Sequence, residues 1–311
     1  MDTTADLAVT LAGLELKNPV LAASGTFGAG REGAAFLDVS EVGGIIVKSM
    51  TLVPWRGRPT PRMAETPAGM LNSIGIQNKG VDHFLAEDLP WLVKRKATVV
   101  ASIAGNTVDE FVRIADKLRT GGRGVGAVEI NISCPNLEDR NNVFAHSPDA
   151  AASVVSAVKE ALKRVPVFPK LSPNVTSITE VADACIGAGA DGLSLINTVI
   201  GMAIDIETRR PMLAGTTGGL SGPAVRPIAV RAIHEVHRAF PHVPLIGQGG
   251  IATARDALEL ILAGASAVAV GTANFVNPRV MLDVAEGIAD YMNRHGIVSV
   301  PELVGAVKLE G

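Results

Sequence analysis

Short runs of apolar residues alternate along this chain with longer segments in which apolar residues recur at helical spacing. The short runs are rich in Val, Ile and Ala, as in the strands of a parallel sheet that is covered by helices. We predict eight such strands, at residues 19–23, 44–48, 98–103, 128–132, 167–171, 192–196, 244–247 and 267–270. Helices are expected at residues 80–93, 107–118, 148–164, 178–188, 224–239, 253–263 and 278–292, with a weaker helical pattern near 31–38. Eight βα units in this order predict the α/β class and a (β/α)8 TIM barrel.

The remaining segments are an N-terminal stretch and three long connections. Residues 7–18 (LAVTLAGLELKN) read as two short strands around Ala12 and Gly13, so we expect a β-hairpin that closes the floor of the barrel. Long connections in compact domains tend to form lids and binding loops, and we expect those at residues 50–79, 133–147 and 198–223 over the active site. No linker composition is present, so residues 1–311 are predicted to form one domain.

Composition and charge narrow the class of partner. Apolar residues make up 47% of the chain and charged residues 19%, with a formal net charge of -3, which allows a large core without a basic surplus. Neither nucleic acid nor an anionic membrane is a predicted partner. The N-terminus lacks a basic n-region, and no apolar run approaches the ~18 residues of a membrane span. We predict a cytoplasmic protein.

The chain has two cysteines, Cys134 and Cys185, which lie far apart and match no metal or redox spacing. No disulfide framework or metal site is therefore expected, and an iron-sulfur cluster, which ordinarily needs about four cysteine ligands, cannot be held by this chain alone. Cys185 lies on the apolar side of a predicted helix, as a buried small hydrophobe does. Cys134, in VEINISCPN, follows a predicted strand; a structural and a catalytic role are both open there.

Polar residues or glycines stand at every predicted strand end, where the chemistry of this fold collects. Strand ends are also simply where polar residues begin. However, lysines and asparagines that converge on one face of an apolar barrel need partners, which a ligand can supply. The strand-end residues are Ser24, Lys48, Ser102, Asn131, Cys134, Lys170, Asn197, Gly249 and Gly271.

Glycine clusters follow the last two predicted strands, in GQGGI (247–251) and VGT (270–272). Barrels often bind phosphate at this place through backbone N–H groups and a helix N-terminus, and glycine permits the close approach. Ordinary turn glycines are the alternative interpretation. We favour a phosphate site, because both clusters fall at the two strands that typically carry one.

Two other motifs carry less weight. GAGREG (28–33) matches the dinucleotide fingerprint, but SGTF separates it from the preceding strand, and the next strand ends in Lys48 where an acidic residue is expected. We interpret it as a glycine-rich loop. HEVH (234–237) is one residue short of a zinc-binding H-E-x-x-H motif and lies within a predicted helix, which favours a solvated helix face.

Nine further motifs occur in order between Asn18 and Ala273: NPVLAASGTFG, IIVKSMT, RMAETPAGMLNSIGIQNKG, NISCPN, PKLSPNV, LINT, GGLSGPAVRPIA, IGQGGI and VGTA. Together they resemble the dihydroorotate dehydrogenase family, which comprises FMN enzymes of pyrimidine biosynthesis. ETPAGMLNSIGIQN and ASGTFG resemble class 1B, which uses NAD through a second subunit. The cysteine in NISCP is similar to that of class 1, whereas class 2 members have a serine base and an N-terminal membrane segment, and neither is found here.

Position by position, this resemblance implies contacts to FMN from Ser24, Lys48, Ser49, Ser102, Asn131, Lys170, Ile196, Gly222, Gly249, Gly250, Gly271 and Thr272. It implies contacts to the substrate from Lys48, Asn72, Ser73, Ile74, Gly75, Ile76, Asn131, Asn197 and Thr198. Ser102 departs from the family pattern, because many members have asparagine there and serine offers a single hydroxyl donor. Ser49 in place of the more usual threonine is a milder change.

The resemblance also implies the chemistry. Oxidation of dihydroorotate to orotate removes a proton and a hydride from adjacent ring carbons; FMN accepts the hydride, and Cys134 is implied as the base. Lys48 would balance charge on the reduced flavin and bind polar substrate atoms, and Lys170 would stabilise charge near the flavin pyrimidine edge. Class 1B membership further implies FAD and a 2Fe-2S cluster on an electron-transfer partner subunit, with a homodimer of this chain at the core of a heterotetramer.

Four alternatives are kept open. Class 1A of the same family passes its electrons to fumarate. A dihydropyrimidine dehydrogenase-like flavoprotein shares the barrel and a related cysteine loop, but acts on an uncharged ring. A flavin-free phosphate-binding barrel, such as an isomerase or lyase, would use only the glycine clusters. The fourth alternative is a non-catalytic scaffold subunit, which would not require the lysines, asparagines and cysteine at the strand ends.

Overall fold

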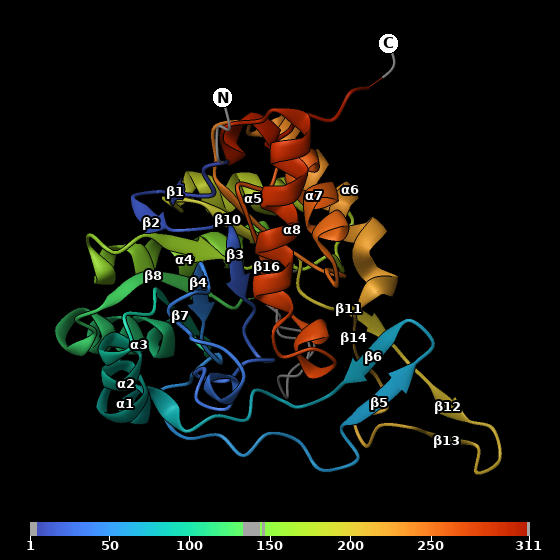
Figure 1. The fold of residues 1–311 in the computed structure, drawn as a ribbon. Coiled ribbons are helices and arrows are strands. Elements are labelled where there is room, and N and C mark those ends of the chain that lie inside the picture. Colours follow the sequence, from blue (N-terminus) through green and yellow to red (C-terminus); the bar gives the residue numbers. More distant parts are fainter. Residues whose placement is uncertain (1–4, 133–143, 145–146, 310–311) are drawn as a thin grey trace.

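A ring of eight parallel strands forms the centre of the computed structural model, which describes residues 5–132, 144 and 147–309. The hydrogen-bonded order is β10-β15-β16-β3-β4-β7-β8-β9 (Figure 1). Just after β9, the Leu171 N–H donates to the carbonyl of Ser194 within β10 at 2.8 Å, so these outer strands meet and the barrel closes. The strands are β3 (Val20–Ala22), β4 (Gly44–Ile46), β7 (Val99–Ile103), β8 (Val125–Ile130), β9 (Val167–Pro169), β10 (Leu193–Leu195), β15 (Leu245–Gln248) and β16 (Ala267–Val270). The predicted barrel is confirmed.

Helices surround the barrel at the predicted places (Figure 1). Several begin where a hydroxyl side chain accepts a hydrogen bond from the N–H three residues later, as at Thr107, Ser147 and Ser177. The helices are α1 (Gly80–His83), a π-helical turn η2 (Phe84–Asp88), α2 (Leu89–Lys94), α3 (Val108–Gly121), α4 (Pro148–Leu162), α5 (Ile178–Gly187), α6 (Arg226–Ala239), α7 (Ala254–Ala263) and α8 (Val280–His295). Among the described residues, none is long and apolar enough to cross a membrane.

The first βα unit differs from the expectation, because its only helix is the 3-10 turn η1 (Gly33–Ala35). Gly28 and Gly30 both have positive φ, which ends any helical path there. A Cβ on Gly33 would collide with the ring of Phe27. The predicted helix near 31–38 is therefore wrong, and GAGREG does not open the α-helix that a dinucleotide site requires.

The N-terminal hairpin is confirmed, with β1 (Val9–Leu11) and β2 (Leu14–Leu16) joined through Ala12 and Gly13. Both turn residues have positive φ, 49° and 86°, as in a type I′ turn. A Cβ on Gly126, near the start of β8, would lie 2.5 Å from Leu14. The hairpin thus packs against the beginnings of the barrel strands.

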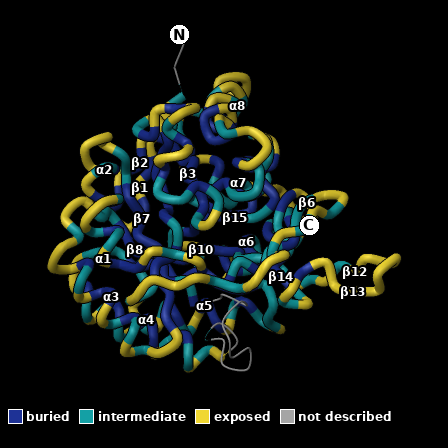
Figure 2. Tube along the Cα trace, turned by 90° about the horizontal axis from the view of Figure 1, so that it is seen from below, coloured by how far each residue is buried: buried dark blue, intermediate teal, exposed yellow. Residues whose placement is uncertain are grey.

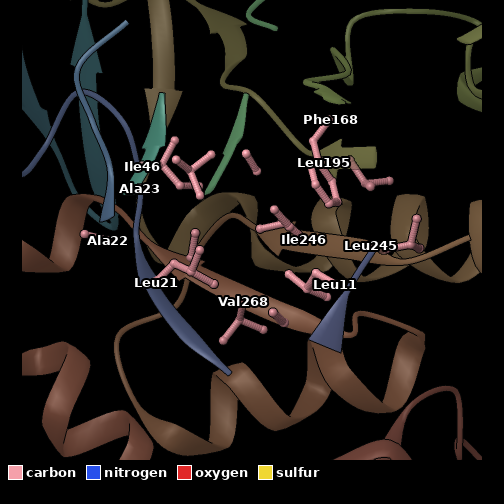
Figure 3. Close-up of a cluster of buried hydrophobic side chains, with 14 of the residues drawn as sticks. Leu11, Leu21, Ala22, Ala23, Ile46, Phe168, Leu195, Leu245, Ile246 and Val268 are labelled. Atoms are coloured by element: carbon pink, nitrogen blue, oxygen red, sulfur yellow. The ribbon is translucent and has the colours of Figure 1, made fainter. Parts of the chain in front are cut away.

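Figure 3 shows apolar side chains from β3, β4, β9 and β15 gathered in the core, with Leu11 of the hairpin beside them. Phe168 is fully buried, and glycine at position 192 makes room for its ring. Apolar side chains therefore occupy much of the barrel interior, and in this fold ligands bind where the strands end.

Two of the long connections contain strands that the sequence did not indicate. They form an antiparallel sheet of β5 (Met63–Thr66), β6 (Gly69–Asn72), β11 (Val199–Gly201) and β14 (Gly218–Ser221), in the order β11-β14-β6-β5. A second hairpin, β12 (Ile204–Asp205) with β13 (Arg210–Pro211), projects from the body and is mostly exposed (Figures 1 and 2). Most of the third connection, residues 133–147, lies outside the described residues.

Candidate active site

Four of the predicted site residues meet through their side chains at the strand ends. Ser49, three residues beyond the end of β4, shares a hydrogen bond of 2.9 Å with Ser102 of β7. The Asn131 amide, directly after β8, donates to the Ser49 hydroxyl at 3.1 Å. The Asn197 amide in turn donates to Asn131 at 3.4 Å. Polar groups from four strands therefore converge on one mouth of the barrel, as the sequence predicts.

A buried glutamate lies beneath this mouth, and the sequence analysis missed it. Glu129 on β8 is fully buried. Its Oε1 accepts from the hydroxyls of Ser24 at 3.3 Å and Ser102 at 3.1 Å. Its Oε2 accepts from the hydroxyl of Ser194 on β10 at 2.9 Å and from the amide of Gln248 on β15 at 3.0 Å. Because these partners come from strands around the ring, the carboxylate lies in the barrel interior.

The two predicted lysines hold different positions. Lys170, just after β9, is 5% exposed, and its ammonium donates to Gln248 Oε1 at 2.6 Å and lies 4.0 Å from Glu129 Oε2. Lys48 is half-buried beyond β4, and its backbone N–H donates to the Gly28 carbonyl. Its Nζ lies 3.9 Å from the point that a Cβ on Gly25 would occupy, which is an ordinary contact distance.

The late glycine clusters form tight turns after β15 and β16. Gly249 and Gly250 have φ of 124° and 78°, which L side chains rarely adopt. Gly271 begins the 3-10 turn η6 (Thr272–Phe275), and a Cβ there would meet nothing closer than 3.8 Å. A Cβ at this position would therefore make only ordinary contacts, with Ala23 and Thr26.

A hydrogen bond connects the antiparallel sheet to this glycine-lined end. Thr272 donates its hydroxyl to Ser221 of β14 at 2.8 Å, which brings the adjoining Gly222 to the same end. In contrast, the Asp256 carboxylate lies at the start of α7, where it accepts from the N–H groups of Ala252 and Thr253 and leaves a negative charge. An anion at this end would therefore rely on the glycine turns rather than on α7.

Three predicted substrate residues gather around β14. The Asn72 amide donates to the Gly219 carbonyl at 3.3 Å, and Thr198 packs so closely on Gly219 that a Cβ there would collide with its hydroxyl. The Thr198 N–H donates to the Asn197 side chain at 2.8 Å. Ile196 is buried directly after β10, at the base of this group.

The remaining substrate segment follows Asn72 along the chain. The buried Ser73 accepts a hydrogen bond from Arg58 at 3.3 Å and donates its N–H to the Arg62 carbonyl at 2.8 Å. Ile74, Gly75 and Ile76 continue the turn, in which Gly75 and Ile76 have positive φ. The side chain of Ser73 is thus held by protein, and Arg58 packs against the turn, with its N–H donating to the Ile74 carbonyl at 3.0 Å.

Only one of the two cysteines lies among the described residues. Cys134, the predicted base, lies outside the described residues. Cys185 on α5 is fully buried, and burial raises the pKa of its thiol to about 12. A thiol that stays protonated is a poor nucleophile and base, which agrees with the structural role predicted for Cys185.

We expect Cys185 to resist alkylation by iodoacetamide in the native protein at pH 8 and to react only after unfolding. Mass spectrometry of peptides from native and urea-unfolded samples measures this directly. Native labelling of Cys185 at the rate of a free thiol would contradict the buried assignment.

The HEVH motif lies on α6, away from the strand ends. Burial lowers the pKa of His237, and the neighbouring His234 lowers it further. Within the described part of the chain, no group of His, Cys, Asp and Glu side chains is arranged to hold a metal ion. The His237 ring packs closely against Gly264 and Gly305, so this end of the motif does not lie on the solvated helix face that the sequence favours.

Comparison with known proteins places these features in a family. The family model for dihydroorotate dehydrogenase matches residues 6–292. Proteins named dihydroorotate dehydrogenase B (NAD(+)), catalytic subunit, are similar along the whole chain: that of Geotalea daltonii is 51% identical over 98% of this chain and 99% of its own, and that of Desulforudis audaxviator is 54% identical over 98% of each. A crystal structure of the Eimeria tenella enzyme DHODH in complex with ferulenol superposes with a TM-score of 0.82 at 25% identity, covering 97% of this chain and 88% of that one. This chain belongs to the dihydroorotate dehydrogenase family.

Proposed function

We propose that this protein oxidises dihydroorotate to orotate in pyrimidine biosynthesis, with FMN bound at the mouth of the barrel and electrons passed to NAD through a second subunit. The observation that carries the proposal is the contact between Asn131 and Asn197 at the strand ends, together with the buried Lys170 just after β9, in a chain of this family. Relatives at about half identity that bear the NAD(+) name favour class 1B over class 1A and over a dihydropyrimidine dehydrogenase.

The described residues fit a flavin mononucleotide. The glycines after β15 and β16, at 249, 250 and 271, suit a phosphate group, because glycine backbone can approach its oxygens closely. The buried ammonium of Lys170 suits the electron-rich pyrimidine edge of the flavin. When bound, FMN supplies the hydride acceptor that the side chains lack.

The chain's own groups serve the substrate. Asn72, Asn131 and Asn197 offer amide donors and acceptors that match the carboxylate and imide of dihydroorotate. Lys48 adds a positive charge for the carboxylate. Cys134 follows the strand that carries Asn131, and we assign it the removal of the substrate proton.

The anaerobic visible spectrum of the purified protein, before and after addition of dihydroorotate, tests this function. We expect a flavin band that bleaches. A flavin band that dihydroorotate leaves unchanged would overturn the substrate assignment, and a protein that stays colourless after reconstitution with FMN would overturn the cofactor and favour a flavin-free barrel.

The partner subunit is proposed to hold FAD and a 2Fe-2S cluster. Two cysteines cannot ligate such a cluster, and residues 28–33 do not form a dinucleotide site. Ile204 and Ile206 on the projecting hairpin are 56% and 81% exposed, which suits a contact with another chain. We propose a homodimer of this chain at the core of a heterotetramer. Purification from the native source should yield a companion iron-sulfur flavoprotein; a preparation that lacks one and does not reduce NAD would contradict this.

We expect Gly250→Ala to weaken FMN binding by about tenfold or more, because strain of this kind costs roughly 1–3 kcal/mol. The position has φ of 78°, and the added Cβ would lie 2.5 Å from the Cβ of Arg226. Fluorescence titration of FMN measures the affinity. Gly187→Ala is the matched control, since a Cβ on Gly187 in α5 meets nothing within 4 Å. Equal affinity of both variants would remove the turn from the cofactor site.

A further inference from the structure

We propose that Glu129 is a positioning residue for the flavin reaction: its buried charge, acting through Gln248, holds the Lys170 ammonium in place and offsets part of its positive charge. This inference rests on the proposed function, because it takes a flavin as the ligand of Lys170. It concerns a residue to which the sequence motifs assign no role. The three side chains sit on β8, just after β9 and on β15, and are 0%, 5% and 3% exposed.

The geometry around Glu129 is that of an ionised carboxylate. Each of its oxygens accepts two hydrogen bonds, at distances from 2.9 to 3.3 Å. All the donors are neutral hydroxyls or an amide, so they stabilise the charge without cancelling it. A buried charge needs a counter-charge, and the Lys170 ammonium at 4.0 Å is the one within salt-bridge distance among the described residues.

Gln248 connects the two charges. Its amide nitrogen donates to Glu129 at 3.0 Å, and its amide oxygen accepts from Lys170 at 2.6 Å. The carboxylate can only accept and the ammonium can only donate, so this orientation of the amide is fixed from both sides. Lys170 is therefore held by its link to Glu129 rather than by direct contact with it.

The link leaves the ammonium facing the site. Gln248 is the one hydrogen-bond acceptor that the Lys170 ammonium reaches among the described residues. An ammonium has three donors, so two stay available for a bound molecule. The positive potential at a bound molecule is that of Lys170 reduced by the negative charge of Glu129. Electron withdrawal from the flavin should therefore depend on both residues.

Sulfite reports this charge without the natural substrate. It adds through sulfur to the flavin N5, and its electron pair enters the ring as negative charge at the pyrimidine edge. A more positive environment there tightens the adduct. Spectrophotometric titration of the FMN-loaded protein gives the dissociation constant, and equilibration with a reference dye gives the two-electron potential.

Two variants should change the sulfite dissociation constant in opposite directions. Glu129→Gln removes the offsetting charge at constant shape, so we expect sulfite to bind at least tenfold more tightly, which corresponds to a rise of about 30 mV in potential. Gln248→Met breaks the link while leaving both charges, so the ammonium can close on Glu129 and turn from the flavin. We expect weaker sulfite binding there.

Glu15→Gln, on the hairpin at the other end of the barrel, is the matched control and should leave the sulfite constant unchanged. General damage to the site would weaken sulfite binding in both test variants. A constant within twofold of the parent in Glu129→Gln, or a change of the same sign in both variants, would overturn the inference.

If Glu129→Gln does not retain FMN, the Gln248→Met result decides, and an unchanged constant there overturns the proposal. Failure of the proposed function looks different. A parent protein that binds FMN and sulfite but is not bleached by dihydroorotate refutes the substrate while the role of Glu129 stands. A parent that binds no FMN refutes both.

Discussion

Cys134→Ala is expected to bind FMN normally and to be reduced by dihydroorotate about 10²- to 10⁴-fold more slowly, the usual contribution of a positioned general base. The reaction removes a proton from one ring carbon as a hydride leaves its neighbour, and the amides at the barrel mouth cannot take that proton at neutral pH. Anaerobic stopped-flow measurement of flavin bleaching separates this step from electron transfer to any partner.

The chain supplies its own control for this experiment. Cys185→Ala changes the other cysteine, which is fully buried on α5 and whose pKa is raised to about 12. We expect a normal bleaching rate for that variant. A rate for Cys134→Ala within a few-fold of the parent would remove it from the base role, and an equal loss in both variants would indicate damage to the fold.

The barrel could be predicted from sequence because parallel strands buried on both faces read as continuous apolar runs. The start of β8 shows the limit of this signal. Val125 and Gly126 are half-buried at the entrance of the strand, and Gly126 interrupts the apolar run, so the predicted strand begins at residue 128, three positions late. The position of Asn131, directly after the C-terminal end of β8, could still be predicted.

The antiparallel sheet could not be predicted, because tertiary contacts rather than residue preferences form it. β14 has the sequence GGLS, and glycine and serine are depleted in strands. A Cβ on Gly218 would lie 2.5 Å from the Asn72 carbonyl oxygen. Glycine is thus required where β14 approaches β6 closely. In the sequence, however, a glycine-rich segment of this kind is typical of a loop.

Glu129 was missed for a related reason. Within an alternating apolar strand, a single charged residue reads as one that faces water. The signal that could have found it is the fold itself, because a strand of a TIM barrel has no face in water and a charge there must lie inside or against the helices. Finding its partners Ser194 and Gln248 requires the closed ring, since they lie on distant parts of the chain.

Lys170→Met is expected to lower the free energy of unfolding by about 3–5 kcal/mol, because it leaves the buried Glu129 without its counter-charge. Adding Glu129→Gln to that variant should restore at least half of the loss, since the remaining groups are all neutral. Urea unfolding at two saturating FMN concentrations separates this effect from the contribution of ligand binding.

The same substitution at an exposed ion pair provides the comparison. Lys117 lies 2.6 Å from Asp82 on the surface, and Lys117→Met should cost at most about 1 kcal/mol, as exposed pairs usually do. A similar small cost for Lys170→Met, or a double variant no more stable than the single one, would show that Glu129 does not depend on this lysine. The expected large difference arises because water solvates Asp82 when its partner is removed, whereas nothing else in the described barrel interior brings a positive charge to Glu129.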